Sequence, residues 1–271
     1  MLSVEIISLL LGFIVGLILA LTGAGGAILA VPFLVFGLHL NVTEAVPIAL
    51  FAVGVSATIG AILGLKAGVV RYRAVALIAV IGMLVSPIGV WTSHQLPSLW
   101  LTITFALVLG YVAVNTFKKT LTTNIMNVDD ANVSKGPCQI DSTEGRLIWT
   151  LPCAWVLSAS GLIAGFLSGL LGVGGGFVMV PALKKATNLS IEQIIPTSLA
   201  IIALVSLFGV TAATINGSIN WIIAAPFAGG SILGMMSGRF IAKKLQGPIM
   251  LRIFSIFALS VAFAMVLKVI Y

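Results

Sequence analysis

Charged side chains are scarce in this sequence: only 8% of its 271 residues are Asp, Glu, Lys or Arg, whereas 60% are hydrophobic. The mean hydropathy of +1.22 lies far outside the range of soluble domains. This composition excludes a soluble enzyme or binding domain and indicates an integral membrane protein. Because the apolar runs are unbroken and do not alternate over about ten residues, a transmembrane β-barrel is excluded as well.

The sequence also lacks the motifs of several catalytic and metal-binding classes. Its two cysteines, Cys138 and Cys153, have neither CxxC nor metal-site spacing, so we interpret them as ordinary residues. There is no GxSxG or HExxH motif, and both histidines lie in predicted turns, which argues against an intramembrane hydrolase. We therefore predict that the protein is not an enzyme and holds no metal or cofactor.

The hydrophobic residues are grouped into runs long enough to cross a bilayer, which takes about 20 residues. The first run has no basic n-region and no small-x-small cleavage site, so we interpret it as a retained helix. These runs predict an all-α integral membrane protein, a polytopic helical bundle of about eight long transmembrane helices plus two short helices. The long helices are expected at 2–21, 45–65, 74–93, 99–117, 148–171, 195–215, 219–242 and 249–270, and the short ones at 27–38 and 176–183.

One glycine-rich pattern occurs twice. Gly23-Ala24-Gly25-Gly26 precedes Val31-Pro32, and Gly172-Val173-Gly174-Gly175-Gly176 precedes Val180-Pro181. A constant offset of 149 residues, which pairs Gly12 with Gly161, continues without a gap to Gly89 and Gly238. We infer an internal duplication. The two transmembrane repeats are residues 1–117 and 148–271, and a polar linker at 118–147 joins them.

The glycine clusters predict that a helix breaks near 22–26 and again near 172–176, because contiguous glycines destabilise a helix by about 1 kcal/mol each. Glycines that recur every four residues are interpreted differently, as helix faces that let a neighbouring helix approach closely. These sets are Gly60, Gly64 and Gly68; Gly161, Gly165 and Gly169; and Gly230, Gly234 and Gly238.

The positions of the basic residues predict how the repeats face each other. If each glycine break forms a hairpin, all of the 14 Lys and Arg residues except Lys268 fall on one side of the membrane. Each repeat then crosses an odd number of times, so the two are inverted repeats, an architecture typical of secondary transporters. By the positive-inside rule we expect a multi-pass protein of the cell inner membrane with the linker in the cytoplasm and both termini outside.

The breaks are also the expected site, because a helix that begins after a glycine turn presents unpaired N–H groups to an anion. No Lys, Arg, Asp or Glu lies near the centre of a predicted span. The predicted substrate-binding residues are Gly25, Gly26, Gly174, Gly175 and Gly176 through their N–H groups, and Thr22, Thr197 and Ser198 through their hydroxyls. Other groups suited to line a cavity are Ser56, Thr58, Ser168, Ser206, Thr211 and Asn115. The alternative for each hydroxyl is a bond back to its own helix.

Residues near the ends of the predicted helices have further interpretations. Glu44 stands at a helix start, where a carboxylate stabilises the helix dipole. Lys184 and Lys185 determine topology or raise the local anion concentration. His39 and His94 are candidates for proton coupling, and a protonatable substrate would provide that coupling equally well.

At these residues the sequence resembles the sulfite exporter TauE/SafE family, the TSUP anion permeases, over the whole chain outside the linker. The stretch from Gly172 to Pro181 matches the family pattern closely, whereas the first copy departs from it at Ala24 and Ala27. The resemblance implies a permease or exporter of sulfite or organosulfonates across the inner membrane, with the bilayer and a small anion as partners and no nucleic acid. Two alternatives from other classes are a membrane scaffold or assembly factor and an intramembrane enzyme. The sequence assigns no oligomeric state.

Overall fold

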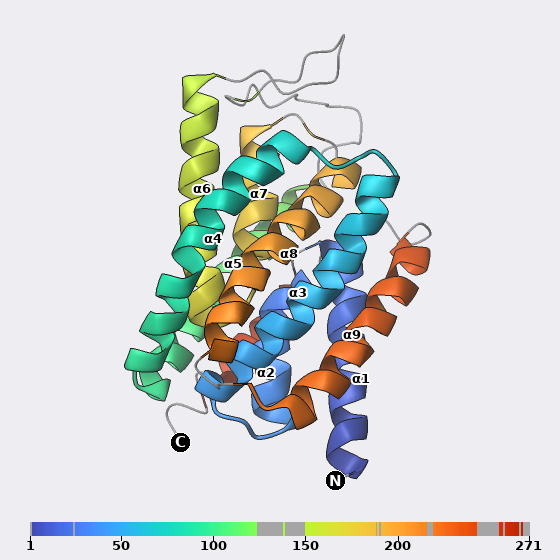
Figure 1. Cartoon of the computed structure of the whole chain (residues 1–271), viewed down its shortest axis with the longest axis vertical. Helices are drawn as coiled ribbons and strands as arrows, with labels where there is room; N and C mark the ends of the chain where they lie inside the picture. Colours follow the sequence, from blue (N-terminus) through green and yellow to red (C-terminus); the bar gives the residue numbers. More distant parts are fainter. Residues whose placement is uncertain are drawn as a thin grey trace.

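The computed structural model describes residues 2–23, 25–123, 138, 150–187, 189, 191–215, 219–242, 255–256, 258–265 and 267. Within these ranges the chain is helical and contains no strand, which confirms the predicted all-α fold. The labelled helices of Figure 1 are α1 (Leu2–Thr22), α2 (Gly25–Gly37), α3 (Val42–Lys66), α4 (Tyr72–Gln95), α5 (Ser98–Thr123), α6 (Leu151–Leu171), α7 (Gly176–Ala186), α8 (Ile191–Ile215) and α9 (Trp221–Ala242).

Seven of these helices are long and apolar enough to cross a membrane, and they coincide with the first seven predicted spans. The expected eighth span, 249–270, is described only in part, at 255–256, 258–265 and 267. Both short helices, α2 and α7, are present directly after the glycine clusters. Helix α5 continues to Thr123, beyond the start predicted for the linker at 118.

Local sequence explains several helix starts. The Asn41 N–H donates to the Glu44 carboxylate at the start of α3, at 3.3 Å, which confirms the capping role expected for Glu44. At the start of α6 the Thr150 hydroxyl accepts a hydrogen bond from the Cys153 N–H at 3.4 Å, and a proline stands in the first turn. These starts are therefore defined by their own residues.

The two glycine breaks turn the chain back on itself. Helix α1 rises from the lower end of the molecule in Figure 1, and α2 returns toward that end before α3 crosses to the other. Helices α6 and α7 form the opposite hairpin, which begins and ends at the upper end. The Arg71 N–H donates to the Thr197 hydroxyl at 3.3 Å, which ties the α3–α4 turn to the first half of α8. The basic residues whose side chains the structure describes therefore share one end, as predicted: Lys66, Arg71, Arg73, Lys184, Lys185 and Arg239.

The two repeats pack by exchanging equivalent partners. Helix α1 lies against α9, and α6 lies against α4 (Figure 1). A Cβ added at Gly12 would lie 2.0 Å from the Phe227 carbonyl oxygen, and one at Gly161 would lie 2.9 Å from that of Ile78. Residues 78 and 227 are themselves related by the 149-residue offset. Each repeat thus places its first helix against the third long helix of the other repeat, and α3 crosses α8 between them.

The fourfold-spaced glycines have two different roles. Gly165 and Gly234 lie directly against backbone of the neighbouring helix, with an added Cβ only 2.5 Å and 2.0 Å from a carbonyl oxygen, as the packing interpretation predicts. Gly68 differs, because nothing lies within 4 Å of its Cβ position and its φ is +69°. The interpretation of Gly68 as a packing residue is therefore wrong; it ends a helix in the left-handed conformation that glycine favours.

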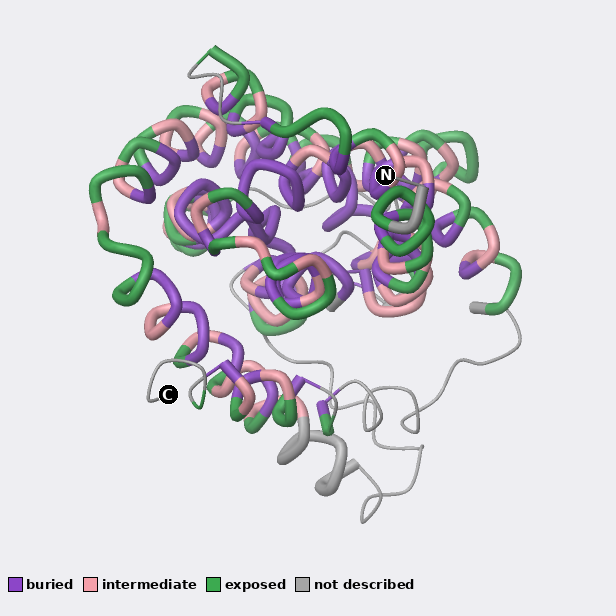
Figure 2. The backbone as a smooth tube through the Cα atoms, turned by 90° about the horizontal axis from the view of Figure 1, so that it is seen from below, coloured by how far each residue is buried: buried purple, intermediate pink, exposed green. Residues whose placement is uncertain are grey.

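The exposed surface of the bundle is apolar. Figure 2 shows buried residues toward the centre of the bundle and exposed residues on its outer sides. Large hydrophobic side chains such as Leu84, Leu107 and Phe240 are among the exposed ones. An apolar surface of this extent is unstable in water but suits the hydrocarbon core of a bilayer. The surface therefore agrees with a multi-pass membrane protein.

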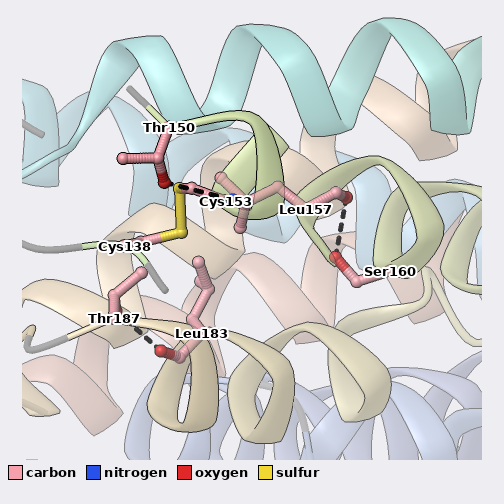
Figure 3. Close-up of a disulfide and its surroundings, with 7 residues drawn as sticks. All are labelled: Cys138, Thr150, Cys153, Leu157, Ser160, Leu183 and Thr187. Carbon is pink, nitrogen blue, oxygen red and sulfur yellow. Dashed lines mark hydrogen bonds between the residues drawn. A yellow bond between two sulfur atoms is a disulfide. The ribbon is translucent and has the colours of Figure 1, made fainter. Parts of the chain in front are cut away.

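Cys138 and Cys153 form a disulfide, drawn in Figure 3. The prediction that they are ordinary residues is therefore wrong. Cys138 also donates its backbone N–H to the Ala186 carbonyl at 3.0 Å. The bridge therefore joins a linker residue to the first turn of α6 and lies beside the end of α7. A sequence separation of 15 residues does not reveal this pairing, because it depends on where the fold places Cys138 relative to α6.

Candidate functional site

The second break is built from three glycines with positive φ. Helix α6 ends at Gly172, whose φ is +69° and whose N–H donates to the Ser168 carbonyl at 2.9 Å. Gly174 and Gly175 follow with φ of +62° and +67°, a region that side chains other than glycine rarely adopt. The next bonds run from Val178 and Met179 to the Gly175 carbonyl, at 3.1 Å and 3.2 Å. The N–H groups at the very start of α7 therefore have no intrahelical acceptor.

Gly174 lies at the centre of the bundle, where α3 and α8 cross. A Cβ added there would lie 2.7 Å from Ile202, 3.2 Å from Val53 and 3.3 Å from the Ser206 hydroxyl oxygen. Val53 and Ile202 are equivalent under the 149-residue offset, so Gly174 contacts the same position in both repeats. The positive end of the α7 dipole is thus placed inside the protein.

The first break is simpler. Gly23 has φ of +72°, and its N–H donates to the Leu19 carbonyl at 2.8 Å. Helix α2 then begins at Gly25, and Gly26 packs so closely on α1 that an added Cβ would lie 2.4 Å from the Val15 carbonyl oxygen. Gly175, the equivalent of Gly26, makes the same contact with Ala164 at 2.6 Å. Both glycines therefore also serve to pack a short helix onto the long helix before it.

The three predicted hydroxyls bond within their own helices. Ser198 donates to the Ile195 carbonyl at 2.8 Å and also lies 3.2 Å from the Gly23 carbonyl oxygen, which places it at the first break. Thr22 donates to Ile18 at 2.8 Å and Thr197 to Gln193 at 2.6 Å. Each of these hydroxyls therefore donates its proton to a carbonyl of its own helix, which is the alternative role given for them in the sequence analysis.

Three other serines carry hydroxyls without a hydrogen-bond partner among the described residues: Ser86 on α4, Ser168 on α6 and Ser206 on α8. All three side chains are fully buried. Ser168 and Ser206 were among the polar groups noted in the sequence, whereas Ser86 was missed. The available signal was a hydroxyl directly before a proline, Pro87, within an apolar run.

Charged and titratable side chains stay at the ends of the described helices. Lys184 and Lys185 are exposed in the last turn of α7. His39 and His94 are exposed at the opposite end. His39 lies in the turn after α2, as predicted, whereas His94 lies in the last turn of α4 and not in a turn outside the helix. Within the described ranges no group of three or more His, Cys, Asp or Glu side chains is placed to hold a metal ion. The donors near the breaks are therefore backbone amides and hydroxyls.

Comparison with known proteins gives a consistent result. The profile of the family described as "Sulfite exporter TauE/SafE" matches residues 8–265. A "Probable membrane transporter protein" of Xylella fastidiosa (strain Temecula1) is 27% identical, over 93% of this chain and 90% of that protein. The "Probable membrane transporter protein YunE" of Bacillus subtilis is 29% identical, over 89% of each. One from Methanocaldococcus jannaschii, MJ0441, is 28% identical over 74% of this chain and 69% of its own length. No solved structure matches significantly.

Proposed function

Because this chain belongs to the sulfite exporter TauE/SafE family of membrane transporters, we propose that it moves small sulfur oxyanions, sulfite or organosulfonates, across the membrane. The observation that carries the proposal is the second break. There the start of α7 and the Ser206 hydroxyl lie inside the bundle. A helix N-terminus in that position is suited to bind an anion without a basic side chain.

In the proposed mechanism, backbone N–H groups of Gly174, Gly175 and Gly176 bind the anion from the second break. The N–H groups of Gly25 and Gly26 would approach the anion from the first break, since α2 and α7 contact each other. Thr22, Thr197 and Ser198 form part of the surrounding wall, and their hydroxyl oxygens fix the helix ends rather than the anion. Inverted repeats support alternating access by rocking one half against the other around a central site.

We further propose that the protein lies in the cell inner membrane and that its basic end faces the cytoplasm. The linker then lies in the cytoplasm and both termini lie outside, because Lys and Arg favour the cytoplasmic side of short loops. Lys184 and Lys185 would attract anions to this entrance. In this proposal proton coupling acts through a protonatable anion such as sulfite, which takes up a proton to become bisulfite, and we propose no catalytic step.

The decisive experiment is flux into proteoliposomes that contain the purified protein. Sulfite, thiosulfate, sulfoacetate, sulfate and chloride are tested with and without a pH gradient. We expect saturable movement of sulfite or sulfoacetate and little movement of chloride. If folded protein moves none of the sulfur anions, the proposal is wrong.

A matched pair of variants connects that flux to the break. Gly175→Leu places a side chain where even a Cβ lies 2.6 Å from the Ala164 carbonyl oxygen, so we expect transport to be lost. Gly110→Leu on α5 is the control, because nothing lies within 4 Å of its Cβ position. Both proteins should insert into the membrane. If Gly175→Leu transports at the wild-type rate, the second break is not part of the binding site.

A further inference from the structure

The three unpartnered serines stand out from the other buried serines of the described helices. Elsewhere a buried hydroxyl donates to a carbonyl of its own helix, as Ser160 does to Leu157 at 2.8 Å, or pairs across helices, as Ser56 and Ser231 do at 2.6 Å. Ser86, Ser168 and Ser206 do neither, although all three are fully buried. A buried polar group without a partner is costly, so it calls for a ligand or another specific reason.

Contacts between neighbours connect these serines around the second break. Ser206 lies beside Gly174, whose added Cβ would be 3.3 Å from the serine oxygen. One turn later on α8, an added Cβ at Gly209 would be 2.9 Å from the Ser86 hydroxyl oxygen. Residues three apart lie on the same face of a helix, so Ser86 contacts the face of α8 that carries Ser206.

Ser168 completes this arrangement from α6. Its carbonyl receives the N–H of Gly172 and so closes the helix at the break. The next residue, Gly169, packs against α4 at Ser86, since an added Cβ would lie 2.0 Å from the Ser86 carbonyl oxygen. The serines thus come from three helices, α4, α6 and α8, that pack on one another, and α6 and α8 also contact α7.

The pseudo-symmetry of the repeats shows that this arrangement exists only once. Gly60 packs against Leu199 and Met235, and its equivalent Gly209 packs against Leu50 and Ser86. Under the 149-residue offset, Ser86 therefore corresponds to Met235. Likewise Ser168 corresponds to Leu19 and Ser206 to Ala57, which are both buried. The framework is symmetric, but these three unpartnered hydroxyls have no hydroxyl counterparts at the equivalent positions Met235, Leu19 and Ala57.

We propose that Ser86, Ser168 and Ser206 are the side-chain ligands of the transported anion, each donating its O–H to one oxygen of a terminal –SO3 group. This inference rests on the proposed function. Three hydroxyls from three helices suit an anion with three equivalent oxygens on one sulfur, as in sulfite and sulfonates, while the α7 N-terminus compensates its charge. Acetate, with two oxygens, and chloride, with one centre, leave donors unpaired and are bound more weakly.

Single alanine variants of the three serines give the test. We expect Ser86→Ala, Ser168→Ala and Ser206→Ala each to raise the KM for sulfite at least about tenfold, because each removes a hydrogen bond to a charged group. The thermal midpoint without ligand should stay the same or rise, because alanine replaces an unpartnered buried hydroxyl. If the serines only stabilise the fold, the alanine variants should instead have a lower thermal midpoint and an unchanged KM. A lowered midpoint, or an unchanged KM in any of the three variants, would overturn the proposal.

Ser160→Ala is the matched control, since Ser160 lies on α6 and is buried but has its hydrogen bond. Its KM should remain that of the wild type. A binding measurement separates this proposal from the proposed function. Sulfite and methanesulfonate should raise the thermal midpoint of the wild type, and at the same concentration should raise that of the serine variants less, even if no flux is detected. Equal stabilisation by acetate or chloride, or none by sulfite, would contradict the three-oxygen site.

Discussion

At the scale of single residues, the glycines with positive φ differ in what surrounds them. Gly68 and Gly172 both have φ of +69°. Gly68 is exposed with nothing within 4 Å of its Cβ position, whereas a Cβ at Gly172 would lie 2.6 Å from the Val46 carbonyl oxygen. The pair therefore separates the cost of backbone conformation from the cost of a steric clash.

We expect Gly68→Ala to lower the free energy of unfolding by about 1–2 kcal/mol, the cost of a left-handed alanine. Gly172→Ala should lose about 2–5 kcal/mol, because overpacking against backbone adds to that cost. Unfolding of both variants in one detergent would measure the difference. Equal losses would mean that α3 moves away from the break without cost.

Individual residues also show what the sequence does not reveal. The glycine breaks were predictable, because contiguous glycines are unfavourable in any helix. The hydroxyl pattern was not, because whether a serine bonds to its own helix depends on its rotamer and neighbours. Thr197 and Ser198 were selected for their place after Pro196, yet their donors are used within α8, and Ser198 lies at the first break. Ser86 became visible only when α4 was placed against α6 and α8.

At the scale of the helices, glycine faces determine how closely neighbours approach. A Cβ at Gly165 would lie 2.5 Å from the Gly82 carbonyl oxygen, so α4 and α6 touch through their backbones. Gly165→Ala should therefore cost about 1–3 kcal/mol by forcing the two helices apart. Thermal unfolding in detergent measures this cost.

The control for that variant is Gly110→Ala on α5, which has free space around its Cβ position. It should be neutral or stabilise by about 0.5–1 kcal/mol, because alanine favours the helix more than glycine does. If the two substitutions have the same effect, close packing of α4 on α6 does not contribute to stability.

Helix positions were predicted well, whereas helix partners were not. Span limits follow from hydrophobic length, which is why seven predicted spans match the structure closely. The glycine sets predicted faces for close packing without saying which helix each face meets. That Gly12 of α1 meets Phe227 of α9 depends on the whole fold, as does the pairing of Cys138 with Cys153.

At the scale of the whole molecule, the proposed orientation is tested by two exposed reporter positions in a Cys138→Ser/Cys153→Ser background. Ala67 lies in the turn at the basic end, and Gln95 lies at the opposite end. We expect a membrane-impermeant maleimide applied to intact cells to label Gln95→Cys and not Ala67→Cys. The reverse pattern would place the basic end outside.

The native cysteines provide a second view of the same orientation. Lys and Arg at this end indicate the cytoplasm, where disulfides rarely persist. The proposed orientation therefore predicts that Cys138 and Cys153 are thiols in growing cells and that the bridge forms after lysis. Acid quenching followed by mass tagging of free thiols measures their state. An oxidised pair in quenched cells would favour an outward-facing linker.

The exchange of helices between repeats has a consequence for biosynthesis. The face of α1 that carries Gly12 and Gly16 packs against Phe227 and Ser231 of α9. Roughly 200 residues separate these partners, so at about 5–20 residues per second α9 leaves the ribosome about 10–40 s after α1. During that interval α1 must wait in the translocon or in lipid with its glycine face uncovered. Helix α1 is therefore made long before its packing partner, and neither half of the chain completes its packing without the other.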